Sequence, residues 1–348
     1  MEAKKVVPVA GALVVCALGG AAFAWLKVPL PWLMGSMLAM AAAQMAGARL
    51  EPLPGGRNAG MVIVGVSLGL YFTAPVVHEV AKYWPWFVAL GFAAIGFGTV
   101  SAFVLTRLSG VGRATAYFGS MPGGAAEMAV MGESFGAAPD RVALAHSMRM
   151  VLVVTLFPVG ITLAGFSATD DYVPVIVPFD ALGLAILLAV AAAAGGLARK
   201  LRVPTAYMMG PLVVTIALTV SGMAWSSVPS VLTNAAQVLL GCALGARFDR
   251  TFLAGAPRFM TALGVSVGIT LALALLVGAG IAWGSGAYLG SALLASAPGG
   301  IAEMSITAKV LRIGVAFVTA AHVVRYVIVV TLTIPVFHLI AKVRAPRR

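Results

Sequence analysis

The sequence predicts an all-α polytopic membrane protein. We expect an inverted tandem repeat with about five transmembrane helices in each half and two re-entrant or broken Pro-Gly-Gly segments. Three observations predict this fold: an apolar composition, a duplication that places matching residues 176 positions apart, and basic residues that alternate between equivalent loops. The first observation requires a membrane, and the other two set how the helices are arranged in it.

The composition is far more apolar than that of a soluble domain. Of 348 residues, 61% are hydrophobic and 10% are charged, and the mean hydropathy is +1.02, whereas soluble domains are about one-quarter charged. The net charge of +12 comes from Lys and Arg that lie mostly between apolar runs, where they orient helices relative to the bilayer. We therefore expect a lipid bilayer as partner and no nucleic acid. Cys16 and Cys242 each lie in an apolar run and indicate neither a disulfide nor a metal site.

The apolar segments occur in the same order in both halves. In the first half they are 6–25, 29–47, 58–74, 84–105, 117–133 and 141–166. In the second half they are 179–198, 204–221, 234–247, 257–283, 286–310 and 313–340. The predicted domains are a first membrane repeat, 1–166, a polar linker, 167–178, and a second membrane repeat, 179–348. The first run is read as a retained spanning helix and not as a signal peptide, because the second half opens in a similar way.

The duplication is strongest at a Pro-Gly-Gly sequence that is followed by Glu. Nineteen residues after each Glu comes a His, and three residues further an Arg. The candidate site residues are Pro122, Gly123, Gly124, Glu127, His146 and Arg149 in the first copy, and Pro298, Gly299, Gly300, Glu303, His322 and Arg325 in the second. Asn58 and Asn234 open Gly-rich segments in the two halves and complete the candidate set for solute or ion binding. No metal ligands are expected among them.

A Pro-Gly-Gly sequence interrupts a helix, because Pro lacks an N–H and consecutive glycines favour non-helical backbone. Broken backbone at membrane depth is tolerated only where it is buried in protein or lines a watery cavity. The half-helix after the break has a positive N-terminal end that attracts anions. Glu127 and Glu303 fall in its first turn, and a carboxylate in a membrane is costly unless it serves a site. The alternative is that each Glu only caps its own half-helix.

His146 and Arg149 are three residues apart and share one face of a helix, as do His322 and Arg325. Arg149 is expected either to pair with Glu127 or to bind a substrate carboxylate. His146 titrates near neutral pH and suits proton transfer. The alternative makes the arginine a snorkelling residue and the histidine a packing residue. The two asparagines either hydrogen-bond between helices and line the cavity, or pack.

Basic residues predict that the two halves are inverted. Lys27 alone follows the first apolar segment, whereas three basic residues within 199–202 follow its counterpart, and the bias alternates at the later loops too. By the positive-inside rule, equivalent loops then lie on opposite faces, which requires an odd number of crossings per half and places both termini in the cytoplasm. Lys309 and Arg312 do not fit this pattern. A parallel repeat with six full spans per half is the alternative.

These motifs resemble those of the bacterial AbrB-duplication membrane protein family. The resemblance extends over nearly the whole chain and rests on the segments 122–128 and 298–304, the downstream His and Arg, and Val-Pro-x5-Gly elements at Val28 and Val203. It implies a multi-pass protein of the bacterial inner membrane, in a family grouped with transporters and also labelled as ammonia monooxygenases or regulators of gene expression. The DNA-binding regulator of the same name is a small soluble protein, and this chain has no soluble basic domain.

The expected function is ion-gradient-driven secondary transport of a small polar or anionic solute, with an indirect effect on gene expression. The arginines and half-helix ends would hold the solute, while the glutamates carry protons or a cation. A membrane regulator or sensor that acts through partners is the alternative. An ammonia monooxygenase is disfavoured because copper sites are rich in imidazole, and the four histidines are His78, His146, His322 and His338. We expect no enzyme activity and no cofactor; whether copies assemble into homo-oligomers stays open.

Overall fold

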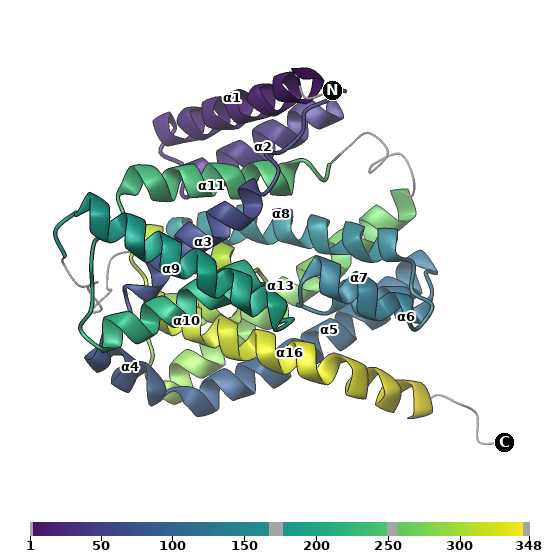
Figure 1. Ribbon diagram of the computed structural model, residues 1–348. Coiled ribbons are helices and arrows are strands. Elements are labelled where there is room, and N and C mark those ends of the chain that lie inside the picture. The colour runs from purple at the N-terminus through teal and green to yellow at the C-terminus, as the bar shows by residue number, and fades with distance from the viewer. Residues whose placement is uncertain (1–2, 167–176, 249–256, 344–348) are drawn as a thin grey trace. The chain divides into compact units, whose positions relative to one another are not determined.

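The computed structural model describes residues 3–166, 177–248 and 257–343, and within these ranges the regular structure is entirely helical (Figure 1). The first half contains α1 Ala3–Trp25, α2 Pro31–Met45, α3 Gly56–Gly69, α4 Ala74–Ala81, α5 Trp84–Ser109, α6 Arg113–Ser120, α7 Ala125–Glu133 and α8 Pro139–Leu163. The second contains α9 Ala181–Lys200, α10 Ala206–Val220, α11 Ser230–Gly245, α13 Pro257–Ser285, α14 Leu289–Ser296, α15 Ile301–Leu311 and α16 Val315–Val343. The predicted linker 167–178 lies almost wholly outside the described residues.

Among the described residues, six helices are long and apolar enough to cross a membrane: α1, α5, α8, α9, α13 and α16. The number rises to seven if α3 and α4, which are bent by 89° at the turn between them, form one broken span. α10 and α11 are apolar but shorter. The predicted all-α, multi-pass membrane protein is confirmed.

One helix was not predicted. The stretch 74–81, which lies almost wholly between the predicted apolar segments 58–74 and 84–105, forms the short helix α4. Val76 and Val80 are buried and lie one helical turn apart. Eight residues are too few for a clear helical period, so the two buried valines alone did not predict a helix.

The chain packs as two compact units that do not coincide with the two repeats. Unit 1 comprises Met1–Ala81, Pro158–Gly255 and Ser305–Ala316, and unit 2 comprises Lys82–Phe157, Ala256–Met304 and Phe317–Arg348. Unit 1 therefore holds α1–α3 with α9–α11, and unit 2 holds α5–α7 with α13 and α14. Each unit combines equivalent helices from both repeats, and both Pro-Gly-Gly breaks belong to unit 2.

Reciprocal contacts relate the two halves of unit 1. Gly65 of α3 packs on α10, where an added Cβ would lie 3.0 Å from the Met208 carbonyl oxygen. Gly241 of α11 packs on α2 in the same way, with an added Cβ 2.6 Å from the Leu33 carbonyl oxygen. These are corresponding positions of the two repeats. In unit 1, therefore, the third helix of each repeat packs on the second helix of the other repeat.

The equivalent helices α3 and α11 run antiparallel in unit 1. Gly60 and Ala236 occupy the same position in the two repeats and face each other, an added Cβ at Gly60 lying 3.0 Å from the Ala236 carbonyl oxygen. Four residues earlier in α3, Gly56 faces Leu239, which is later in α11. Moving backwards along one helix thus moves forwards along the other at this contact.

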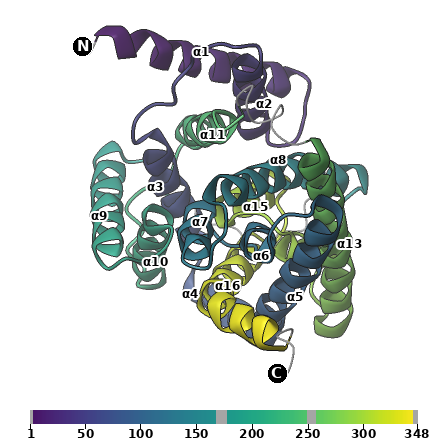
Figure 2. The same cartoon turned by 90° about the vertical axis from the view of Figure 1, so that its right-hand side faces the viewer.

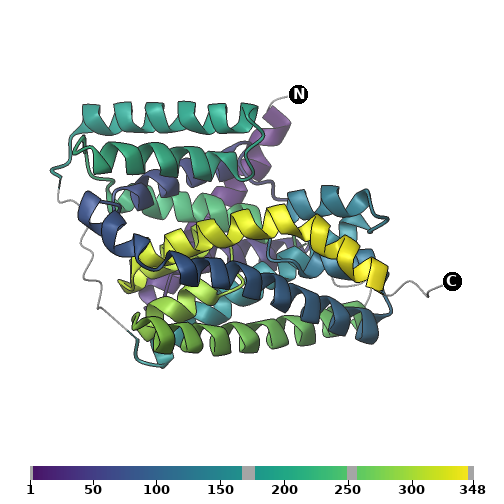
Figure 3. The ribbon, with the colours of Figure 1, turned by 90° about the horizontal axis from the view of Figure 1, so that it is seen from below.

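The equivalent helices α5 and α13 run antiparallel in unit 2, where they lie side by side (Figure 2, Figure 3). The Ser101 and Ser266 hydroxyls are 2.5 Å apart. Near the other end of the contact, Arg258 Nε donates to the Leu108 carbonyl oxygen over 2.9 Å. A later residue of α5 again faces an earlier residue of α13. In each unit, therefore, two equivalent helices of the two repeats run antiparallel to each other.

We expect Gly241→Ala to lower the free energy of unfolding by about 1–3 kcal/mol, because its Cβ would overlap the backbone of α2. Thermal unfolding of the purified protein in detergent measures the change. Gly264→Ala in α13 is the matched control, since an added Cβ there meets nothing within 4 Å. Equal melting temperatures for the two variants would refute the close contact of α11 with α2.

Candidate functional site

Each predicted break is present as two short helices separated by the Pro-Gly-Gly sequence. α6 ends at Ser120 and α7 begins at Ala125, while α14 ends at Ser296 and α15 begins at Ile301. Met121, immediately after α6, is extended with ψ 134°, which directs the chain out of the helix. The carbonyl groups at the ends of α6 and α14 consequently lack partners within their own helices.

Both glutamates lie over the start of their own half-helix. A Cβ at Gly124 would overlap the Glu127 carboxylate, and a Cβ at Gly300 would overlap that of Glu303. Glycine is required at these two positions because the carboxylate occupies the space of a side chain. This geometry is that expected of a glutamate at the third helical position that reaches back to the helix start. Glu303 is 4% exposed, whereas Glu127 is half-buried.

Arg149 holds the end of α6. Its Nη1 donates to the Ser120 and Met121 carbonyl oxygens, at 3.1 and 3.0 Å, and its Nη2 donates to His146 Nδ1 at 2.9 Å. The arginine is 4% exposed. Of the two expected roles, pairing with Glu127 is not what this structure shows: the guanidinium instead satisfies backbone carbonyls that the break leaves without helical partners.

His146 is held in one tautomer by its two neighbours. Its Nδ1 receives the hydrogen bond from Arg149, so Nδ1 carries no proton, and Nε2 then donates to the Phe118 carbonyl oxygen at 2.9 Å. Protonation of Nδ1 would break the bond to the arginine. The geometry therefore favours a structural role for His146 over proton transfer.

The second copy repeats this arrangement with one difference. His322 Nε2 donates to the Leu294 carbonyl oxygen over 2.9 Å, and Arg325 donates to the carbonyl oxygens of Ala297, through Nη1, and Gly299, through Nη2 at 2.5 Å. Because Nη2 turns to Gly299, the buried Nδ1 of His322 has no hydrogen-bond partner. Arg149 and Arg325 are equivalent in position but differ in one hydrogen bond. Nη2 of Arg149 donates to His146, whereas Nη2 of Arg325 donates to the Gly299 carbonyl oxygen.

Each break is contacted by the long helix that follows the other break. Tyr326 of α16 approaches Glu127, its hydroxyl 3.4 Å from Oε1. At the corresponding position of α8, Met150 lies against the second break, its Cε 3.0 Å from where a Gly300 Cβ would be. Sequence reasoning missed Tyr326, because a search for duplicated residues cannot find a position that differs between the copies.

The two predicted asparagines lie in unit 1, and therefore in a different unit from the breaks. Asn234 lines a small cavity between α3, α11 and the end of α15, of about 190 Å³. Asn58 is half-buried near the start of α3 and is not among the residues that line it. The cavity also contains Lys309, the residue that did not fit the predicted charge pattern.

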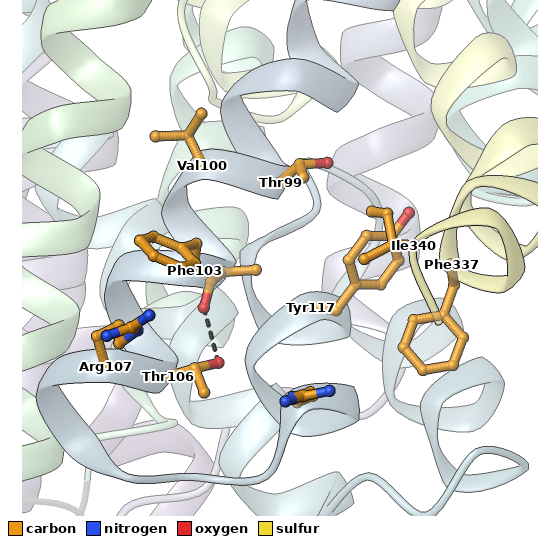
Figure 4. A pocket seen from close by; sticks show the side chains of 10 residues that line it. Thr99, Val100, Phe103, Thr106, Arg107, Tyr117, Phe337 and Ile340 are labelled. Atoms are coloured by element: carbon orange, nitrogen blue, oxygen red, sulfur yellow. Dashed lines mark hydrogen bonds between the residues drawn. The ribbon is translucent and has the colours of Figure 1, made fainter. Parts of the chain in front are cut away.

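Unit 2 contains a larger cavity, of about 750 Å³, between α5, α6 and α16 (Figure 4). It is lined mainly by apolar side chains, and Figure 4 shows Tyr117, Phe337 and Ile340 on one side and Phe103 and Thr106 on the other. The Tyr117 hydroxyl donates to the Thr333 carbonyl oxygen over 2.9 Å, which fixes α6 to α16. Among the described residues, no group of three His, Cys, Asp or Glu side chains that could hold a metal ion is present.

This fold and site define a class: polytopic helical membrane proteins with a duplicated, interrupted helix. Within it, the chain belongs to the AbrB family, described as "Transition state regulatory protein AbrB", which matches residues 32–341. "Uncharacterized protein YhjN" of Bacillus subtilis (strain 168) is 26% identical over 361 residues, covering 94% of this chain and 92% of that protein. "Putative regulator AbrB" of Escherichia coli (strain K12) is 26% identical over 336 residues, covering 94% of each chain. The family resemblance read from the motifs is confirmed.

We expect Arg149→Lys to lower the free energy of unfolding by at least about 2 kcal/mol, because an ammonium group cannot reach two carbonyls and a histidine at once and leaves buried acceptors unpaired. Chemical or thermal unfolding in detergent measures the loss. Arg141→Lys, an exposed position on the same helix, is the control and should leave stability unchanged. A variant Arg149→Lys as stable as the control would contradict the anchoring role.

Proposed function

We propose that this protein is a secondary transporter that moves a small polar or anionic solute across the bacterial inner membrane, driven by an ion gradient. The observation that carries the proposal is the pair of breaks in unit 2: each is contacted by the long helix that follows the other, and each places a carboxylate at the start of a half-helix. Interrupted helices related by pseudo-symmetry are the usual place for solute and coupling-ion sites in transporters.

The charge at the breaks favours an anionic solute when the two glutamates are protonated or hold a cation, as proposed below for coupling. Both arginines are buried, and they donate to carbonyl oxygens and a histidine but form no ion pair in the described part of the chain. Their charges therefore add to the positive ends of α7 and α15. The sequence prediction had these arginines grip the solute directly. The proposal now assigns them a supporting role, in which they hold the breaks open and make the potential positive.

We further propose that the repeats are inverted in the membrane, with both termini cytoplasmic. The antiparallel contacts of α3 with α11 and of α5 with α13 support this, because equivalent helices of a parallel repeat would run in the same direction across the bilayer. The alternating basic loops support it independently. The two compact units supply the separate bodies that alternating access requires.

The inversion predicts opposite accessibility of two equivalent exposed positions that follow α1 and α9. In a protein whose two cysteines are replaced by Ser, we expect Leu26→Cys to react with a membrane-impermeant maleimide added to whole cells. Leu201→Cys should react only after the cells are permeabilised. Both leucines are more than half exposed. Labelling of both from the same side would support the parallel arrangement instead.

The glutamates are proposed to carry the coupling ion or proton, since each lies at a break and Glu127 remains half-buried and open to a ligand. We expect Glu127→Gln or Glu303→Gln to reduce solute uptake by proteoliposomes at least about 10-fold while insertion and stability stay the same. Glu133→Gln is the matched control, because Glu133 is exposed at the far end of α7. The solute is first identified by screening small carboxylates and amino acids for gradient-driven uptake by the wild type. Normal uptake by both single variants would exclude the coupling role.

A regulator is the second candidate, and the family description and the name of the Escherichia coli relative favour it. A deletion strain complemented with Glu127→Gln/Glu303→Gln separates the two functions. If altered gene expression follows from solute movement, this variant fails to restore the wild-type expression profile. Full restoration by a variant that does not transport would favour direct regulation through partners.

A further inference from the structure

Unit 1 contains a cavity with several polar side chains in a largely apolar lining, which the duplicated motif does not explain. It has a volume of about 190 Å³ and lies between α3, α11 and the end of α15. Its polar lining residues are Ser67, Ser230, Thr233, Asn234, Gln237 and Lys309. A concentration of hydroxyl, amide and ammonium groups is unusual among helices that are otherwise apolar.

Lys309 brings a positive charge into this cavity without a compensating carboxylate. Its Nζ donates to the Ser67 hydroxyl and lies 5.8 Å from the centroid of the Tyr71 ring. None of the described residues offers it an ion pair. An ammonium group has three donors, so the single hydrogen bond to Ser67 leaves donors available to a ligand. A partly buried cation in a membrane protein without a counter-ion is a strong indication of an anion site.

Gln237 provides the second, independent observation. Its side chain is 5% exposed and lines the same cavity, and its Oε1 has no hydrogen-bond partner. Buried amide oxygens are nearly always hydrogen-bonded, because an unsatisfied one costs free energy. A ligand that carries a hydrogen-bond donor would satisfy this oxygen.

The described part of the other repeat does not carry the same polar residues at the corresponding positions. Glu133 stands at the position that corresponds to Lys309 and is exposed, and Met61 corresponds to Gln237. The charge is thus reversed and the amide is lost in the other copy. The cavity is therefore distinct from the duplicated breaks.

We propose that this cavity binds a small carboxylate that also bears a hydroxyl or amino group. The carboxylate accepts from Lys309 and from the hydroxyls around it, and the ligand's own donor bonds to Gln237 Oε1. A cavity of about 190 Å³ is smaller than the usual pockets for drug-sized ligands, which limits the ligand to a few heavy atoms. The site does not depend on transport through the breaks, and its occupancy can be measured on protein that does not transport.

The test is calorimetric titration of the purified full-length protein with sodium 2-hydroxypropionate, sodium propionate and sodium chloride at constant ionic strength. We expect saturable binding of both carboxylates, with 2-hydroxypropionate tighter because only it carries a hydroxyl for Gln237. Lys309→Gln should weaken binding by about 10-fold to 100-fold, as loss of a charge-assisted hydrogen bond does, whereas Lys309→Arg should retain it. Gln237→Leu should abolish the preference for 2-hydroxypropionate over propionate.

Two variants serve as controls. Lys200→Gln removes an exposed lysine at the end of α9 and should bind as the wild type does. Glu133→Gln changes the exposed position that corresponds to Lys309 in the other repeat and should also bind as the wild type does. The binding that counts is the part that Lys309→Gln removes, so a failure of the transport proposal would not affect this result. Unchanged binding by Lys309→Gln, or no saturable carboxylate binding by the wild type below about 50 mM, would overturn the proposal. If Lys309→Gln does not fold, the Gln237→Leu variant provides the test. An unchanged preference of this variant for 2-hydroxypropionate over propionate would overturn the proposal.

Discussion

Hydrogen bonds from buried arginines to free helix-end carbonyls are the interaction on which this structure depends. A Pro-Gly-Gly break leaves carbonyl groups without partners in an environment that has little water, and such groups are costly. Arg149 and Arg325 satisfy them, and a histidine one turn earlier fixes a further carbonyl. Without these donors, buried carbonyl groups at each break would be left without partners, and the interrupted backbone would be destabilised.

Because the arginines bind the backbone, the motif residues have different roles. Arg149 and His146 are hydrogen-bonded to backbone carbonyls and to each other. In the proposed transporter they would therefore contribute a positive potential and a fixed backbone. The glutamates lie at the positive ends of the half-helices, where a titratable or cation-binding group can respond to a ligand. His322, whose Nδ1 has no partner, marks the place where the copies differ. Such a difference is expected if the two breaks have unequal roles in one cycle.

The sequence predicted the helices, the breaks and the duplication, because apolar runs, Pro-Gly-Gly sequences and fixed spacings are local signals. It could not predict that Arg149 bonds to carbonyls instead of Glu127, since backbone acceptors leave no trace in side-chain patterns. Tyr326 and the cavity around Lys309 were missed for another reason: a search for repeated residues finds symmetric features only. Lys309 did not fit the predicted alternation of basic residues between equivalent loops, and this misfit was the signal in the sequence that could have pointed to the cavity.

The central claim is that both breaks contribute to one solute site. It is tested most directly by the stoichiometry of solute binding, measured by calorimetry with the transported solute in a Lys309→Gln background. The account predicts one solute per chain, and loss of binding when either Glu127 or Glu303 is replaced by Gln. Two solutes per chain, each lost with its own glutamate, would show that the breaks are independent sites and would contradict the account.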